Sequence, residues 1–165
     1  MRFTRPMLAA LAVLVTTVAV TPALHAQDER RPRWTLSGVT EVLRVTRTAW
    51  GVGPSLGLRR DFGPRWGVEL RAALPAFGRN AGGAAIDLAA TWVHFDGATE
   101  LGASLGGTAF LVGDNSELIG GGVGVYASAH AARWLTRGFG LTAGASLRTA
   151  IGAYPGAWAG VAVRF

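Results

Sequence analysis

The sequence contains no cysteine and no lysine, and these absences exclude several classes of protein. Without cysteine, the chain cannot build a disulfide framework, a thiol nucleophile or a cysteine-ligated metal site. All 16 strongly basic residues are arginine, and outside the short run Arg30–Arg33 they are scattered along the chain. A nucleic-acid-binding surface needs basic residues gathered on one face. The composition therefore argues against a nucleic-acid partner.

The apolar run near the N-terminus is too short to cross a membrane as a helix. It extends over 14 residues, from Met7 to Val20, whereas a transmembrane helix needs roughly 20. Two arginines precede the run, and small residues follow it up to Ala26. This succession is typical of a secretory signal peptide. We therefore predict a signal peptide over residues 1–26, cleaved near Ala26, and a flexible polar lead-in over residues 27–33.

The rest of the chain, residues 34–165, alternates with a period of two. Apolar residues alternate with glycine, serine, threonine and charged residues in segments that turn-forming residues separate. Neighbouring side chains of a strand point to opposite sides of a sheet, so this pattern predicts strands with one apolar and one polar face. Eight such strands follow one another from Trp34 to Phe165. Each has about ten residues, the length that a membrane-spanning strand requires.

The charged residues predict which solvent each face meets. Within the strands, they lie on the face of small residues: Arg59, Asp61, Glu69, Arg71, Asp87 and Arg148. The opposite face is almost free of charge, which suits lipid better than water. Lipid also forbids open sheet edges, so the sheet must close. The expected fold is an all-β, eight-stranded antiparallel up-and-down transmembrane β-barrel over residues 34–165, closed by pairing of the first and last strands.

The interior of an eight-stranded barrel is just wide enough for side chains. Charges buried there need partners. We therefore predict a structural polar network in the lumen, formed by Arg59, Glu69, Arg71, Asp87, Tyr126, His130 and Arg148.

Aromatic residues of membrane barrels gather where strands meet the two membrane surfaces. We accordingly expect two girdles of interface aromatics, whose principal members are Trp34, Trp50, Trp66, Trp92, Trp134, Trp158 and Phe165.

The connections between strands predict an orientation. Short turns are expected at Gly63–Arg65, Asp96–Thr99 and Thr136–Gly138, and other connections at Arg47–Thr48, Pro75–Gly83, Gly113–Gly121 and Tyr154–Gly156. Two of the second group are longer. Outer-membrane barrels have short periplasmic turns and longer external loops. Both ends of the barrel domain are therefore expected on the periplasmic side.

Together, the signal peptide, the eight alternating segments and the terminal Phe165 resemble the small outer-membrane β-barrels of the OmpA/OmpX type. The ending Val161–Phe165 is similar to the signal by which such barrels are recognised for insertion. The resemblance implies an outer-membrane location, contact with outer-membrane lipid, and recognition by the barrel-assembly machinery through the C-terminal strand. It implies a structural or surface-binding role through the extracellular loops, without catalysis or a cofactor. It names no external ligand.

Two other functions stay open at this level. Ser128 and His130 lie two residues apart on one face, which suggests a lipid-modifying barrel enzyme. However, their order and their lumen position differ from those of lipid A deacylase barrels, and no third group is shown to orient the histidine. The many lumen glycines also leave room for a very narrow pore. No HxH or HxxxH spacing predicts a metal site around His94 or His130.

The register of the first strand is a separate uncertainty of the pattern. Glu41 and Arg44 fall on opposite faces of the segment Trp34–Val45, and a β-bulge would bring them together.

Overall fold

The computed structural model describes residues 34–44, 50–77, 81–114, 118–150 and 152–165. The predicted signal peptide, the lead-in and the connection at Arg47–Thr48 lie outside these residues. The described strands are β1 (Trp34–Arg44), β2 (Trp50–Asp61), β3 (Trp66–Ala73), β4 (Ala76–Phe77), β5 (Ala81–Asp96), β6 (Thr99–Asp114), β7 (Leu118–Trp134), β8 (Phe139–Arg148) and β9 (Tyr154–Arg164). Within the described ranges, no helix is long and apolar enough to cross a membrane.

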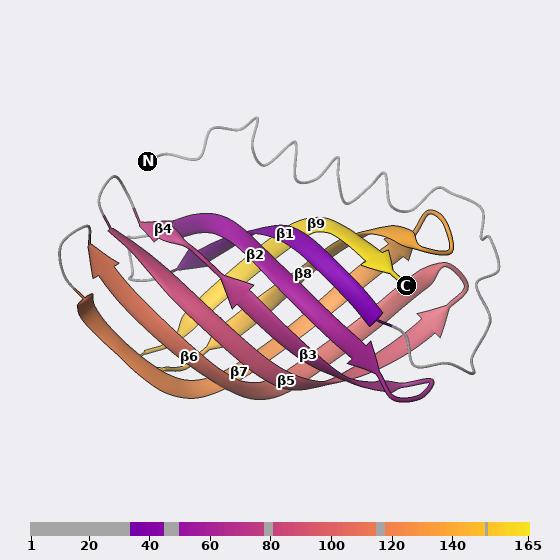
Figure 1. Cartoon of the computed structure of the whole chain (residues 1–165), viewed down its shortest axis with the longest axis horizontal. Helices are drawn as coiled ribbons and strands as arrows, with labels where there is room; N and C mark the ends of the chain where they lie inside the picture. The colour runs from indigo at the N-terminus through magenta and orange to yellow at the C-terminus, as the bar shows by residue number, and fades with distance from the viewer. Residues whose placement is uncertain (1–33, 45–49, 78–80, 115–117, 151) are drawn as a thin grey trace.

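The sheet closes into a barrel because β1 pairs with both β2 and β9 (Figure 1). The antiparallel pairing of β1 with β9 runs from Thr35 opposite Arg164 to Leu43 opposite Gly156. At its end, the amide of Trp34 donates to the carbonyl of Phe165 at 2.9 Å, and the amide of Phe165 donates back at 3.0 Å. The predicted closed barrel, with its first and last strands in contact, is confirmed.

β3 and β4 together form one stave, by which we mean one strand of the barrel wall. Both pair with β2 on one side and β5 on the other. The register with β2 does not shift between them, since Ser55 lies opposite Ala73 and Val52 opposite Ala76. Pro75, between them, has no amide hydrogen to donate to the ladder. The nine segments therefore make eight staves, as the sequence predicted.

Three tight turns lie at one end of the barrel, together with Trp34 and Phe165; we call this the turn end. They occupy the three predicted positions. In the turn between β5 and β6, Gly97 has a φ of 58°, a conformation that glycine adopts without steric cost. In the turn before β8, the hydroxyl of Thr136 accepts hydrogen bonds from the amides of Gly138 and Phe139. Each turn therefore depends on a residue type that favours turns: glycine for its positive φ, and threonine for a hydroxyl that accepts hydrogen bonds from the backbone.

The opposite end, which we call the loop end, differs from the prediction. The strands continue into the three of the four expected connections that the structure describes: Ala76–Phe77 pairs with Ala81–Gly82, β6 reaches Asp114 before β7 begins at Leu118, and Tyr154–Gly156 opens β9. The predicted boundaries Pro75–Gly83, Gly113–Gly121 and Tyr154–Gly156 are therefore wrong.

The glycines in these segments allow close packing within the sheet. A Cβ atom on Gly83 would lie 3.0 Å from the ring of Phe77, and one on Gly121 would lie 2.6 Å from the side chain of Leu111. Glycine in a strand often marks such a close approach. Sequence composition could not separate this role from that of a loop.

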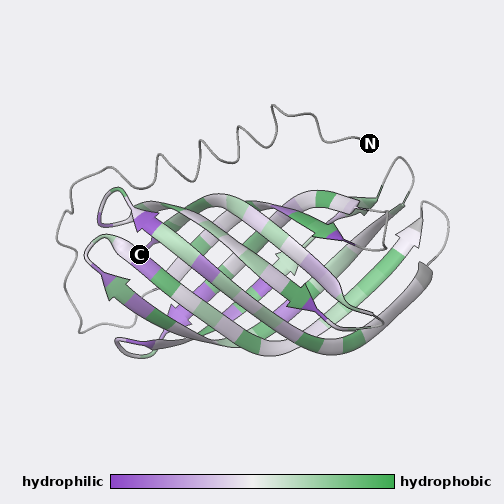
Figure 2. Cartoon of the chain, turned by 180° about the vertical axis from the view of Figure 1, so that it is seen from behind, coloured by the Kyte–Doolittle hydropathy of each residue, from purple (hydrophilic) through white to green (hydrophobic). Residues whose placement is uncertain are grey.

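The side chains alternate between the outside and the interior, as Figure 2 shows in the alternating colours along the strands. The outer surface carries large apolar residues that are half exposed or more, among them Leu56, Leu88 and Leu105. In β1 the register with both neighbours is continuous, so the suggested bulge is absent. Glu41 points into the interior, and Arg44 lies outside with its guanidinium 5.8 Å from the Trp50 ring.

The aromatic residues form one girdle and not two. The exposed aromatics of the turn end are Trp34, Phe62, Trp66, Trp92, Phe95, Phe139 and Phe165. At the loop end, Trp50 is the one exposed aromatic among the described residues. Trp134 and Trp158, predicted at the interfaces, are only 6% and 5% exposed because their positions in the alternation face inward. Position along the strand places an aromatic near one end of the barrel, but the alternation decides whether it faces outward, as Trp134 and Trp158 show.

Glycine at position 53 is predicted to be necessary for the fit of β2 against the third stave. A Cβ there would lie 2.7 Å from the carbonyl carbon of Leu74, so Gly53→Ala should destabilise the barrel by about 1–3 kcal/mol. The urea midpoint of the refolded barrel, followed by its gel mobility without boiling, measures this. Gly63→Ala is the control, because its Cβ would meet nothing within 4 Å. An equal effect of the two substitutions would refute the explanation.

Candidate functional site in the barrel interior

The interior is closed at the loop end by an apolar cluster. Leu43, Ala73, Ala85 and Phe110 are buried together there. Phe77, Val112, Ala150 and Tyr154 pack against them, and the rings of Phe110 and Tyr154 lie 5.0 Å apart. These residues come from β1, β3, β4, β5, β6 and β9 and from Ala150 just after β8, so their side chains meet from several sides of the barrel. We call this cluster the apolar plug.

Below the plug, Arg148 joins three staves that are not neighbours. Its Nη1 donates to Glu41 of β1 at 2.6 Å, and its Nη2 donates to Asp87 of β5 at 2.7 Å. Ser146 donates a further hydrogen bond to Glu41 at 2.9 Å. Arg148 itself is fully buried on β8, with its guanidinium 5.3 Å from the Tyr126 ring. The group therefore ties opposite walls of the barrel together across the lumen.

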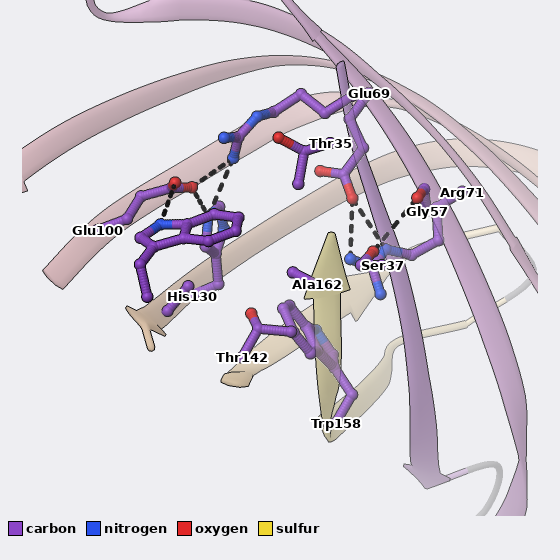
Figure 3. A pocket seen from close by; sticks show the side chains of 13 residues that line it. Thr35, Ser37, Gly57, Glu69, Arg71, Glu100, His130, Thr142, Trp158 and Ala162 are labelled. Carbon is purple, nitrogen blue, oxygen red and sulfur yellow. Dashed lines mark hydrogen bonds and ion pairs between the residues drawn. The ribbon is translucent and has the colours of Figure 1, made fainter. Parts of the chain in front are cut away.

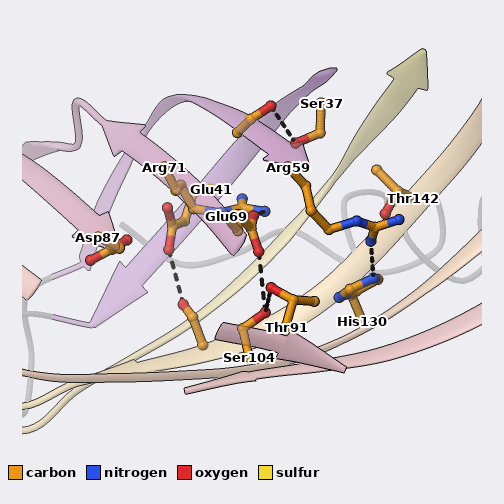
Figure 4. A network of polar contacts seen from close by, with 12 residues as sticks. Ser37, Glu41, Arg59, Glu69, Arg71, Asp87, Thr91, Ser104, His130 and Thr142 are labelled. Atoms are coloured by element: carbon orange, nitrogen blue, oxygen red, sulfur yellow. Dashed lines mark hydrogen bonds and ion pairs between the residues drawn. The ribbon is translucent and has the colours of Figure 1, made fainter. Parts of the chain in front are cut away.

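The next group toward the turn end is built on β3. Arg71 donates to Glu69 at 2.8 Å, and Ser104 of β6 donates to the other carboxylate oxygen at 3.1 Å (Figure 4). Thr91 shares a hydrogen bond with Ser104 at 3.0 Å. The guanidinium of Arg71 lies 4.4 Å from the centre of the Trp158 ring. An ion pair and an inward tryptophan thus occupy the middle of the lumen.

Glu100 is the centre of the third group, at the turn end. Its two oxygens lie 2.6 Å from Arg59 and 2.6 Å from Arg164. The indole of Trp134 donates to it at 3.2 Å, and the ring of His130 lies 3.2 Å away. Arg59 also forms a 2.8 Å ion pair with Asp61. Side chains of β2, β7 and β9 therefore meet at this one buried carboxylate of β6.

A cavity of about 30 Å³ lies between the second and third groups (Figure 3). It has room for roughly one or two water molecules. Besides Arg59 Nε, which lies in the ion pair with Asp61, three buried polar atoms of its lining have no hydrogen-bond partner among the described residues: Thr35 Oγ1, Arg71 Nη1 and Trp158 Nε1. The chamber is therefore polar, and its size suits water and not an organic ligand.

The seven residues proposed for the lumen network all lie inside the barrel, divided among these groups: Arg59 and His130 at Glu100, Glu69 and Arg71 on β3, and Asp87, Tyr126 and Arg148 below the plug. Sequence analysis left out the central acceptors, Glu41 and Glu100. Both residues lie two positions from inward-facing residues of the same strand, and this alternation could have predicted that they face the lumen. In the sequence, Glu41 lies in the strand whose register was uncertain, and Glu100 directly follows the turn Asp96–Thr99.

Ser128 and His130, the candidate nucleophile and base, do not form a hydrogen-bonded pair in the described part of the chain. The ring of His130 contacts Glu100 and Arg59 instead. Covalent catalysis needs these two groups within hydrogen-bond reach. His94 lies on the outside of the barrel, with its ring stacked 6.1 Å from that of Trp92. The described residues contain no cluster of three or more metal-ligating side chains.

No protein-family model matches the sequence, and a comparison with curated proteins finds no match either. Solved structures do match the fold. The outer membrane protein OprG of Pseudomonas aeruginosa superposes with a TM-score of 0.63 at 11% identity, over 86% of this chain and 99% of OprG. Ail of Yersinia pestis gives 0.60 at 13% identity, over 81% of this chain and 97% of Ail.

Neisserial surface protein A gives a TM-score of 0.59 at 11% identity, over 84% of this chain and 98% of that protein. All three are similar to this chain over nearly their whole lengths. At such identities, the likeness establishes the small eight-stranded barrel fold and nothing finer.

Loss of the Arg148 guanidinium is predicted to be strongly destabilising. Arg148→Met leaves Glu41 and Asp87 buried without their cation, and breaking a buried pair in this way costs about 3–5 kcal/mol. Denaturant unfolding of the barrel in detergent micelles measures the change. Arg65→Met removes the same charge from an exposed turn and should change stability little. Comparable stability of the two variants would contradict the role assigned to Arg148.

Proposed function

We propose that the protein resides in the outer membrane as a closed, non-conducting barrel. Its role is structural, or it is carried out at the surface of the loop end. The filled interior is the observation that carries this proposal, because it leaves the outside and the ends as the places where the protein can act.

The outer surface supports residence in a bilayer. Among the described residues, outward-facing charges on the strands lie at or next to strand ends, as with Arg44, Arg60, Asp96 and Arg133. Between them the surface is a belt of aliphatic side chains. Water would leave this belt without a partner, whereas hydrocarbon matches it. The neighbouring solved structures OprG and Ail are outer-membrane or attachment proteins by their names, which favours the same location here.

The interior supports a barrel that does not conduct. The apolar plug fills one end, and three ion-pair groups follow below it. Five carboxylates face four guanidinium groups there, namely Glu41, Asp61, Glu69, Asp87 and Glu100 against Arg59, Arg71, Arg148 and Arg164. An ion would have to displace several of these pairs in succession. A very narrow pore is therefore disfavoured.

Two further parts of the proposal rest on the sequence. The segment 1–26 acts as the export signal, and the strand that ends at Phe165 is recognised by the barrel-assembly machinery. A binding role at the loop end is supported only by a protein of similar fold. Ail, an attachment protein by name, has also been solved in complex with the heparin analogue sucrose octasulfate.

The reconstituted protein is predicted not to conduct ions. Planar bilayers that contain the folded barrel should show no reproducible current steps, because the plug and the ion pairs fill the lumen. Insertion is verified in parallel by the difference in gel mobility between boiled and unboiled samples. Regular conductance steps from the inserted barrel would refute the closed lumen and favour the narrow pore as the function.

Membrane residence is tested with single cysteines, since the chain has none of its own. Leu70→Cys and Leu105→Cys lie on the apolar belt, where the native leucines are 48% and 64% exposed. In liposomes, both should resist a water-soluble maleimide, whereas Arg65→Cys in the turn should react. Equal labelling of all three in the bilayer would contradict the proposal.

A further inference from the structure

Arg60 differs from the arginines of the interior. It is the second-last residue of β2 and points outward, with Trp34 opposite it on β1 and Val68 opposite it on β3. Arg59, Arg71, Arg148 and Arg164 each bind a buried carboxylate. Arg60 binds none among the described residues. A guanidinium without a carboxylate partner, at the edge of an apolar surface, is available to an anion from outside the chain.

Two aromatic rings hold the Arg60 side chain in place. Its guanidinium carbon lies 5.3 Å from the centre of the Trp34 ring and 5.4 Å from that of the Phe62 ring. Both contacts are within the range of cation–π attraction. Among the described residues, the N–H groups of Arg60 have no hydrogen-bond acceptor, so they stay available to an anion. A planar donor fork of this kind suits the oxygens of a phosphate group.

The surface beside Arg60 continues as an apolar path toward the middle of the barrel. Leu58 is two residues before it on the same face, and Leu36 of β1 lies directly opposite Leu58. Both are exposed, and Leu56 continues the row on β2. The acyl chains of a phospholipid whose phosphate binds Arg60 would therefore lie on these leucines. The turn-end girdle places Arg60 at the height where headgroups lie.

We propose that Arg60, Trp34 and Phe62 form a binding site for the headgroup of an anionic phospholipid. The carboxylates of β1, β2 and β3 (Glu41, Asp61 and Glu69) all point into the lumen. Beside Arg60, the outer faces of β1, β2 and β3 therefore offer no described side-chain carboxylate for the ammonium group of a zwitterionic headgroup. The site favours a phosphate whose headgroup has no cation, as in phosphatidylglycerol, over phosphatidylethanolamine.

This inference rests on the proposed membrane residence, and its test separates the two. Native mass spectrometry of the folded barrel gives the affinity for single phosphatidylglycerol and phosphatidylethanolamine molecules with identical acyl chains. The native protein should bind phosphatidylglycerol about fivefold more tightly, the factor that one arginine near the membrane surface contributes. Arg60→Gln should abolish the preference, and Arg60→Lys should keep part of it.

Arg137→Gln is the matched control, because Arg137 is exposed in a turn of the same end. It should retain the preference. If Arg60→Gln and Arg137→Gln lost the preference equally, the preference would come from the overall positive charge of the turn end, and the proposal of a site at Arg60 would be refuted. Absence of any preference in the native barrel would overturn the proposal. The shift in gel mobility reports folding of each variant, and reaction of the Leu70→Cys and Leu105→Cys proteins in liposomes would instead count against membrane residence.

Discussion

The pairing of β1 with β9 is the contact on which the rest of the structure depends. Once the sheet closes, every stave has two neighbours, and backbone groups of the wall find their partners within the wall. Closure with eight staves also fixes the width of the lumen. Inward positions must then fit together, so glycine alternates with a few large side chains such as Phe110, Tyr126 and Arg148. The apolar plug and the three ion-pair groups are consequences of that limited space.

Sequence could predict which way most side chains face, because facing depends only on alternation along one strand. It placed Asp87 and Arg148 in the lumen for that reason. It could not predict that Arg148 binds Glu41 and Asp87, since those contacts cross the lumen between non-neighbouring staves. Trp134 and Trp158 were wrongly predicted at the membrane interfaces because that prediction used their position near the strand ends and not the alternation of facing directions. The loop-end boundaries were misjudged because glycine serves turns and close packing equally well.

The arginines divide into two populations with different environments. Those inside the barrel are bound to carboxylates and hold the walls together, so their substitution acts on stability. Arg60 and Arg44, on the outer face at opposite ends, lie over aromatic rings. Their surroundings are set by whatever solvent surrounds the barrel. The same residue type thus stabilises the fold in one place and meets the environment in the other.

The single aromatic girdle has a consequence for the proposed residence in a membrane, because bilayers differ in thickness. Aromatic side chains fix a membrane protein at the depth of the headgroups, and among the described residues every exposed aromatic except Trp50 lies at the turn end. A change in hydrocarbon thickness should then be taken up at the opposite end, where aliphatic side chains can rise or sink with little resistance. The turn end would keep its depth, and the loop end would vary its height above the surface.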